Sequence, residues 1–388
     1  MSNFIHIEAC DFESFPLGGT LTFAKQLISC FPNSVSLVGF VNDGEPIGVW
    51  FVKEIDGTKY DFFGICSVED VKKTRFPKRL FAYFALNKFI NKICTNRLEN
   101  IFTQTPEFVF VLAKHKWKNF CFCFAGLGNS VGLSKYKFLR IFGKVYEKKL
   151  FNDLKSSTTK ILAASDNNTI LQMAKRYGIS ADFIKQFPTR YDNQVFKVLN
   201  QSKCRNQINL GQATKIFITT GRLSYIKGWS LILDAFRIVN EKIPDSIFIF
   251  VGDGEDRSKI DDYVSNYFNN NQVILAGRKS PEQVAFYLNA ANVFVLGSLV
   301  EGWPTSMVEA IACGKTIVST DISGAREMII ENQNGFVLGK RDIGQFAELM
   351  IKALTLPEPN ESSLHISTKY SLKNLKSDFE KEWLNEII

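Results

Sequence analysis

Short hydrophobic runs alternate along the chain with longer segments whose apolar residues recur every three or four positions. The runs predict buried strands at residues 4–7, 36–40, 120–124, 161–164, 216–219, 247–251, 273–276, 293–296 and 316–319. The periodic segments predict helices, among them residues 22–29, 137–154, 231–240 and 281–289. Strands and helices that alternate in this way are typical of an α/β fold, in which crossover helices cover parallel sheets.

Three segments depart from this alternation. Residues 45–65 predict an antiparallel hairpin that turns at Asp56 and Gly57. A polar segment at residues 200–214 separates two stretches of alternating elements. A loop is expected at residues 355–368, before a last amphipathic helix at 372–387. Because 388 residues exceed what one core usually supports, we expect two domains that meet near residue 199.

The composition is that of an ordinary globular protein, with 45% hydrophobic and 22% charged residues. Eight scattered cysteines and three histidines show no zinc-type spacing, so neither a disulfide framework nor a structural metal is expected. No apolar run reaches the roughly 18 residues of a membrane span, and residues 2–10 do not resemble a signal peptide. These features predict a cytoplasmic location.

Positive charge is concentrated in one part of the chain. Residues 71–150 hold 17 Lys and Arg against 3 Asp and Glu, a net charge of +14, whereas the whole chain has +8. Basic clusters beside aromatic residues, at 72–84 and 135–140, favour attachment to anionic lipid headgroups. A packed helix with a solvated basic face is the alternative. A nucleic-acid surface would explain the charge but not the paired glutamates described next, so nucleic acid is not an expected partner.

Two glutamates eight residues apart, Glu301 and Glu309, flank the most informative segment. Residues 291–296 predict a buried strand and Pro304 suits the first turn of a helix, so Glu301 is expected in a loop and Glu309 inside the helix. Such a loop and helix N-terminus bind phosphate through free backbone N–H groups. Carboxylates repel phosphate, so the pair indicates hydroxyl groups on the same ligand. For the pair alone, a capping Glu and a surface Glu on an ordinary helix stay an alternative.

Glycines and cations follow three other predicted strands. Gly221 and Arg222 end one strand, and Lys227 stands five residues after Arg222, where the two cations could straddle a diphosphate. Gly252 ends the next strand without the third glycine of the dinucleotide fingerprint, and Gly277 with Arg278 ends another. Each motif alone is also consistent with an ordinary turn.

In this order the motifs resemble glycosyltransferase family 4 through most of residues 214–345: Gly221-Arg222 with Lys227, then Gly252-Asp253-Gly254, then Gly277-Arg278, then Glu301 through Glu309. The resemblance implies the GT-B fold, with two facing Rossmann-like domains and a cleft between them. Residues 1–198 would bind the acceptor, and a last helix at about 372–388 would pack back on them. Residues 199–371 would bind a nucleotide sugar.

The resemblance also implies roles for individual residues. Arg222 and Lys227 would hold the donor diphosphate and Glu301 would hydrogen-bond the donor sugar, so these three are the candidate catalytic residues. Glu309 would accept hydrogen bonds from the ribose hydroxyls. The other donor-site candidates are the backbone N–H groups near Thr305 and Ser306, the glycines Gly221, Gly252 and Gly277, and Arg278.

In the first half, Gly18 and Gly19 resemble the family's glycine loop near the donor phosphate and the acceptor. Relatives often carry a His followed by Gly after the strand at 120–124. This chain has Ala125 and Gly126 there, so no imidazole is available at that point. Glu107 and Asn129 are candidates for acceptor contact.

The resemblance implies a retaining enzyme of the hexosyltransferase type. It would move a sugar from a UDP- or GDP-type nucleotide sugar to a saccharide or lipid-linked acceptor. Such a step fits the assembly of polysaccharide, lipopolysaccharide or glycolipid at the inner face of the cytoplasmic membrane. It needs neither cofactor nor metal, because the cations neutralise the leaving diphosphate. The alternatives are a nucleotide-sugar epimerase of the same fold, and a basic membrane- or nucleic-acid-binding protein with a degenerate site.

Overall fold

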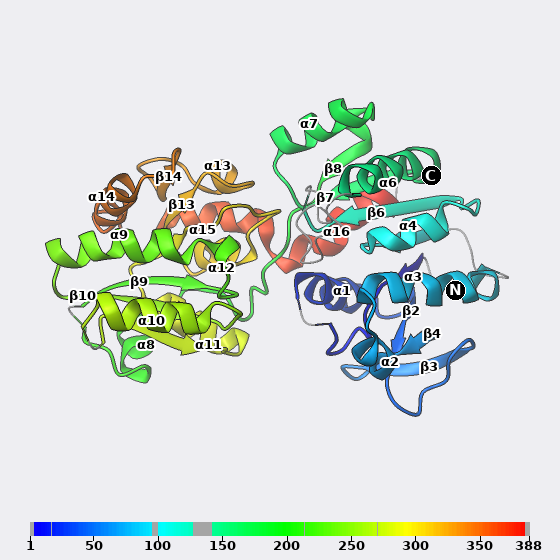
Figure 1. Cartoon of the computed structure of the whole chain (residues 1–388), viewed down its shortest axis with the longest axis horizontal. Helices are drawn as coiled ribbons and strands as arrows, with labels where there is room; N and C mark the ends of the chain where they lie inside the picture. Colours follow the sequence, from blue (N-terminus) through cyan, green and yellow to red (C-terminus); the bar gives the residue numbers. More distant parts are fainter. Residues whose placement is uncertain are drawn as a thin grey trace. The chain divides into compact units, whose positions relative to one another are not determined.

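The computed structural model describes residues 4–16, 18–94, 100–126, 142–212, 214–269 and 271–384. The chain divides into two compact units, Met1–Pro188 with Leu375–Ile388 (unit 1) and Thr189–Asn374 (unit 2). Each unit is an α/β domain with its own sheet (Figure 1). The division follows Pro188 rather than residue 198, because the next residues bond within unit 2. Leu199 donates its backbone N–H to the Asn289 side chain (2.8 Å), and Tyr191 forms a bridge with Ser371.

Unit 1 contains a mainly parallel sheet with the strand order β3-β4-β2-β1-β5-β6-β7-β8. Its strands are β1 (Phe4–Ile7), β2 (Val35–Val41), β3 (Trp50–Ile55), β4 (Thr58–Ser67), β5 (Asn100–Thr103), β6 (Asn119–Phe124), β7 (Lys160–Ala163) and β8 (Ile184–Gln186). The expected hairpin is confirmed as antiparallel β3 and β4, with Asp56 and Gly57 at positive φ (47° and 76°) in its turn. The strand order reverses between β1 and β5, which is where open α/β sheets bind ligands.

The helices of unit 1 connect these strands. They are α1 (Gly19–Cys30), α2 (Val68–Lys73), α3 (Lys78–Cys94), α4 (Pro106–Leu112), α6 (Gly143–Ser157), α7 (Asn167–Tyr177) and α16 (Leu375–Phe379). Contacts join α3 to α4 and α4 to α6, so these three helices form one layer over the sheet (Figure 1). The helix expected at 137–154 corresponds to α6, and residues 137–141 lie outside the described residues.

The C-terminal segment returns to unit 1, but not as one long helix. α16 is followed by a π-helical turn, Glu380–Leu384, and a 3-10 turn, Leu372–Asn374, precedes it. Phe379 and Trp383 pack their rings against Phe4 and Phe102. Trp383 also donates its indole N–H to the side chain of Asn119 (2.7 Å). The segment therefore completes the core of unit 1.

Unit 2 contains a parallel sheet with the order β11-β10-β9-β12-β13-β14. Its strands are β9 (Lys215–Thr220), β10 (Ser246–Val251), β11 (Val273–Gly277), β12 (Val293–Leu296), β13 (Thr316–Thr320) and β14 (Gly335–Leu338). Counted from β9, this is the order 3-2-1-4-5-6 of a Rossmann sheet, which reverses between β9 and β12. The four central strands are buried along most of their length, as their hydrophobic runs predict.

Helices flank this second sheet. They are α8 (Gln201–Gln207), α9 (Trp229–Lys242), α10 (Arg257–Tyr267), α11 (Pro281–Ala290), α12 (Thr305–Ala312), α13 (Ala325–Met328), α14 (Ile343–Ala353) and α15 (Glu361–Ser367). α9 and α14 pack against each other on the sheet (Figure 1). The loop expected at residues 355–368 is wrong in part, because Asn360 caps α15 by accepting the Ser363 N–H (3.1 Å). Among the described helices, none has the length and apolarity to cross a bilayer.

Candidate functional site

Three loops of unit 2 meet at the carboxyl ends of the neighbouring strands β9, β10 and β11. Gly221 donates its backbone N–H to the carbonyl of Val251 (2.9 Å), and Gly252 donates to Gly277 (2.9 Å). The three glycines that the sequence singles out separately therefore lie along one edge of the sheet. Arg278 follows them with an exposed side chain.

Two of the loops approach their neighbours too closely for any side chain. Gly228 has a φ of 68°, and a Cβ there would stand 1.7 Å from the carbonyl oxygen of Gly297. Gly252 has a φ of 147°, and its Cβ would stand 1.8 Å from the Gly221 carbonyl oxygen. Only glycine fits these positions. The loop from β9 to α9 is thus packed directly on the end of β12.

This packing brings one of the two candidate cations, Lys227, to the first candidate glutamate. Lys227 Nζ lies 2.6 Å from Glu301 Oε1, and Ser298 donates its hydroxyl to the same oxygen (2.7 Å). Arg222 is exposed on the same loop, and together with Gly221 and Lys227 it lines a small pocket. Lys227 therefore contacts Glu301 at the reversal point between β9 and β12, and it shares a small pocket with Arg222.

Helix α12 begins at Thr305, just after this cluster. No side chain caps its N-terminus and no acidic residue stands in its first turn, so the first N–H groups, at Thr305 and Ser306, can bind an anion. The Thr305 hydroxyl also lies 3.3 Å from the hydroxyl of Thr189. Glu309 is the fifth residue of α12, and its desolvation raises the pKa of its carboxyl to about 8. The glutamate in the loop and the glutamate in the helix thus have different environments.

A residue that the sequence motifs did not indicate, Arg341, secures this loop. Its Nη1 donates to the carbonyl oxygens of Gly297 (2.9 Å) and Ser298 (3.1 Å), four and three residues before Glu301 in the chain. Arg341 follows β14 and belongs to no recognisable motif, so only the fold brings it to the site. Within the described part of the chain, no three His, Cys, Asp or Glu side chains gather as a possible metal site.

The candidates in the first half belong to unit 1. Gly18 and Gly19 begin α1, which also lacks a side-chain cap and an acidic first turn. Glu107 lies in α4 and accepts a hydrogen bond from the Tyr146 hydroxyl (3.2 Å). Asn129 lies outside the described residues.

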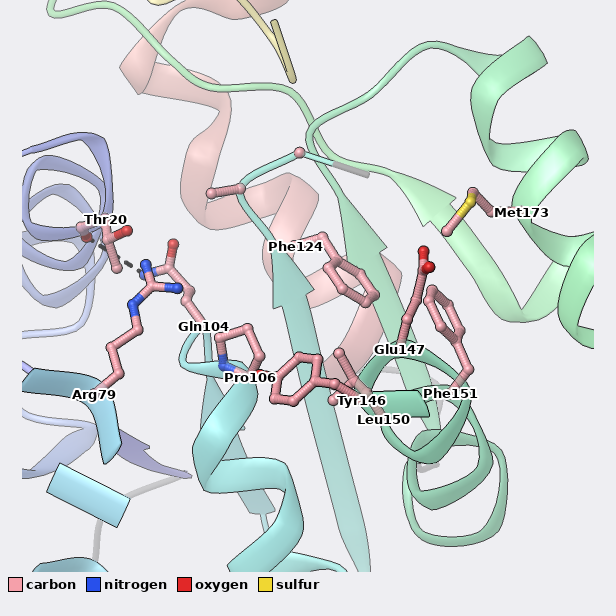
Figure 2. A pocket seen from close by; sticks show the side chains of 12 residues that line it. Thr20, Arg79, Gln104, Pro106, Phe124, Tyr146, Glu147, Leu150, Phe151 and Met173 are labelled. Carbon is pink, nitrogen blue, oxygen red and sulfur yellow. Dashed lines mark hydrogen bonds between the residues drawn. The ribbon is translucent and has the colours of Figure 1, made fainter. Parts of the chain in front are cut away.

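Unit 1 also contains a cavity of about 230 Å³ that the sequence did not predict. It opens beside the point where the strand order reverses, at the ends of β5 and β6, and Figure 2 shows the side chains that line it. Ala125 and Gly126, which follow β6, form part of its wall. Arg79 and Glu147 are charged members of the lining, and neither carries a sequence motif.

Residues 200–368 match the family of glycosyl transferases group 1. Curated relatives resemble parts of the chain. An uncharacterized glycosyltransferase of Methanocaldococcus jannaschii is 31% identical over 153 residues, which are 39% of this chain and 37% of the relative. The 2-deoxystreptamine N-acetyl-D-glucosaminyltransferase of Niallia circulans is 26% identical over 73% of this chain and 66% of its own length. A galactosyltransferase of Escherichia coli that acts on α-D-GlcNAc-diphosphoundecaprenol is 25% identical over 56% of this chain and 54% of its own length.

The chain thus spans between about a third and two thirds of these relatives. Solved structures match along nearly the whole chain, and at this identity the match shows the fold. Sucrose-phosphate synthase from Thermosynechococcus elongatus has a TM-score of 0.76 at 16% identity and 97% coverage of both chains. HepE of Anabaena in complex with UDP has a TM-score of 0.72 at 14% identity and 100% coverage of both chains. The fold is therefore GT-B, and residues 200–368 match the model of the glycosyl transferases group 1 family.

Proposed function

We propose that this chain is a retaining glycosyltransferase of the hexosyltransferase type, in glycosyltransferase family 4. It transfers a sugar from a nucleotide-diphosphate sugar to a saccharide or lipid-linked acceptor. The observation that carries the proposal is the contact of Lys227 Nζ with Glu301 Oε1 (2.6 Å) at the reversal point of the second sheet, where Lys227 and Arg222 also line one pocket. Cations and a carboxylate side by side suit a ligand that carries both phosphate and sugar hydroxyls.

Each group has a task in this proposal. Arg222 and Lys227 bind the donor diphosphate, and Glu301 accepts hydrogen bonds from hydroxyls of the transferred sugar. The uncapped start of α12 adds backbone N–H donors for the phosphate. Glu309 contacts the ribose. The close packing of the glycine loops allows backbone groups near Gly221, Gly252 and Gly277 to approach the nucleotide.

The proposed chemistry is a front-face substitution. The bond between the anomeric carbon and the diphosphate oxygen breaks, and the acceptor oxygen bonds to the same face of that carbon. The leaving diphosphate takes the proton of the acceptor hydroxyl. Arg222, Lys227 and the N-terminus of α12 stabilise the charge that develops on the leaving group, which is where electrostatic catalysis contributes most.

The relatives support this class of reaction and its setting. The names of the Niallia and Escherichia relatives describe transfer of N-acetylglucosamine and of galactose from UDP-Gal, and HepE was solved with UDP. We therefore favour a UDP-type donor, and a role in cell-surface polysaccharide, lipopolysaccharide or glycolipid assembly. Neither an epimerase nor a degenerate basic binding protein finds support among these relatives. We also propose a cytoplasmic enzyme that attaches to the inner face of the membrane through the basic residues of unit 1.

A thermal-shift screen of UDP- and GDP-sugars tests the donor site. A ligand that binds the folded chain raises its melting temperature by mass action, so one class of nucleotide sugar should stabilise the protein. Glu301→Ala should lose the preference for the sugar while keeping the response to the free nucleotide. Arg222→Ala should weaken donor affinity about tenfold to a hundredfold, since it removes a charge-assisted contact.

Glu241→Ala is the matched control, because Glu241 is an exposed carboxylate on α9. It should respond to donors like the unsubstituted chain. The proposal fails if no nucleotide sugar stabilises the protein, or if Glu301→Ala and Glu241→Ala respond alike.

A further inference from the structure

The cavity of unit 1 lies at the same topological position as the donor site of unit 2, beside the point where the strand order reverses. Its walls come from the starts of α1 and α3, from the ends of β5 and β6, and from α6 and α7. The lining residues are Thr20, Arg79, Gln104, Pro106, Phe124, Tyr146, Glu147, Leu150, Phe151 and Met173, with Ala125 and Gly126 (Figure 2). Its volume of about 230 Å³ is below the roughly 300–1,000 Å³ of sites for drug-sized ligands, so it has room for a single ring.

One carboxylate that lines this cavity, Glu147, is buried and has one oxygen without a hydrogen bond. Glu147 is 5% exposed, and its Oε2 makes no hydrogen bond. That oxygen forms an ion pair with Arg176 Nη2 (3.6 Å), and the Tyr177 hydroxyl also interacts with the Glu147 carboxyl group. Figure 2 shows the carboxylate pointing into the open space between Phe124 and Met173. Buried carboxylate oxygens normally accept hydrogen bonds, so this one is suited to a donor group on a ligand.

The opposite end of the cavity carries positive charge. Arg79, near the start of α3, is exposed there, and Gln104 fixes the adjacent wall by donating to the Thr20 carbonyl (3.5 Å). A second cavity, of about 60 Å³, shares Thr20 and Arg79 with the first and adds Lys78. The two cavities thus adjoin at a wall that offers a guanidinium and an ammonium group, a combination that suits a phosphate.

We propose that this cavity holds one sugar ring of the acceptor and that the ring carries a phosphate. Glu147 accepts a hydrogen bond from a ring hydroxyl, and Arg79 binds the phosphate. The aromatic and aliphatic wall at Phe124, Tyr146 and Leu150 packs against the apolar face of the ring. The inference rests on the proposed function and deepens it, because it names the acceptor as a phosphate-linked saccharide. Glu147 would then determine acceptor specificity.

Binding of soluble probes to the full chain tests the inference without any turnover. The probes are glucose 1-phosphate, galactose 1-phosphate and N-acetylglucosamine 1-phosphate, and the three unphosphorylated sugars serve for comparison. Isothermal titration calorimetry measures the binding of each. At least one sugar phosphate should bind more tightly than its parent sugar. Glu147→Gln should weaken the binding of that sugar phosphate about tenfold or more, since a charge-assisted hydrogen bond is lost. Arg79→Gln should weaken the binding of the sugar phosphate and leave the binding of the parent sugar unchanged.

Two matched controls make the same chemical changes nearby. Asp153→Asn removes a carboxylate from the outer part of α6, where Asp153 pairs with Lys149, and Arg75→Gln removes an exposed guanidinium before α3. Both should bind the probes as the unsubstituted chain does. The inference is overturned if no sugar phosphate binds, or if Glu147→Gln binds as tightly as Asp153→Asn.

A further arm separates a soluble acceptor from a lipid-linked one. A short polyprenyl diphosphate carrying the same sugar should bind more tightly than the sugar phosphate if the natural acceptor is lipid-linked, and equally if it is soluble. UDP-induced stabilisation reports on unit 2 and should survive Glu147→Gln. If the unsubstituted chain binds UDP but no sugar phosphate, this inference alone is contradicted, whereas absence of any nucleotide binding contradicts the proposed function.

Discussion

Glu301 and Glu309 belong to one motif but have carboxyl groups in different environments. Glu301 is bonded to Lys227 and Ser298 in the loop after β12. Glu309 lies inside α12, where desolvation alone raises the pKa of its carboxyl to about 8. The sequence predicts the loop and the helix for these two residues. It cannot predict the desolvation, because that depends on the elements which pack around α12, including α15 and β13.

Glu309 should make the stability of the protein depend on pH. Its folded-state pKa of about 8 is above its ordinary value of 4.5, so the folded state retains a proton that the unfolded state releases. The free energy of unfolding should therefore fall as the pH rises from about 4.5 to about 8, with a slope of at most about 1.4 kcal/mol per pH unit from this group.

Glu309→Gln should remove this part of the slope, because the amide does not titrate. Urea denaturation at several pH values between 5 and 8 measures the effect, and Glu241→Gln on the exposed face of α9 serves as the control. A Glu309→Gln variant with an unchanged slope would show that the carboxyl is ionised at neutral pH.

At the scale of elements, most strands were predictable, including the four-residue strands β1, β7 and β12, and the strands that were missed have four residues or fewer. The nine expected strands are confirmed as β1, β2, β6, β7, β9, β10, β11, β12 and β13. The sequence reading missed β5, β8 and β14, which have only four, three and four residues. Short strands such as Ile184–Gln186 have too few residues for a periodic pattern, so they form only because a neighbouring strand is available to pair with.

The turn from β9 into α9 should tolerate no Cβ at Gly228. Gly228→Ala meets both a left-handed φ of 68° and the carbonyl of Gly297 at 1.7 Å, so the loop that carries Lys227 must move. We expect the free energy of unfolding to fall by more than the roughly 1–2 kcal/mol that a left-handed backbone conformation costs an alanine.

Gly277→Ala is the matched comparison within the same unit. Gly277 has a similar φ of 72°, but its Cβ would meet only the Arg257 guanidinium at 3.7 Å. Urea denaturation should show Gly228→Ala to be clearly the less stable variant. Equal stability of the two would mean that the loop from β9 to α9 adjusts without cost.

At the scale of the whole molecule, the distribution of surface charge and aromatic side chains distinguishes unit 1. Phe76 and Phe84 are 68% and 62% exposed beside the basic residues at the start of α3. Other aromatic residues of α3, Phe81 and Phe89, pack against the core instead. The second basic cluster, residues 135–140, lies outside the described residues. The first cluster thus has only part of its aromatic side chains available to a membrane.

Unit 1 should bind anionic vesicles at low salt. Co-sedimentation with phosphatidylglycerol vesicles is expected, and binding should weaken as salt screens the charges. The double variant Lys73→Ala with Arg75→Ala should bind about thirtyfold more weakly, at about 1 kcal/mol for each cation.

The control removes two exposed lysines of unit 2, Lys242→Ala with Lys340→Ala, and should leave vesicle binding unchanged. Neutral phosphatidylcholine vesicles should bind neither variant. Equal affinity for neutral and anionic vesicles, or no binding at low salt, would rule out the proposed attachment through this surface.

The sequence by itself determined the α/β class, most strands and the candidate motif for the proposed donor site. These depend on local periodicity and on residues a few positions apart, as with Arg222 and Lys227. Tertiary structure decided which distant residues meet. It brings Arg341 to the loop of Glu301, Asn119 to Trp383, and Glu147 with Arg79 into one cavity. These partners come from elements far apart in the chain and belong to no local sequence pattern. They meet only because the folded sheets bring the ends of distant strands together.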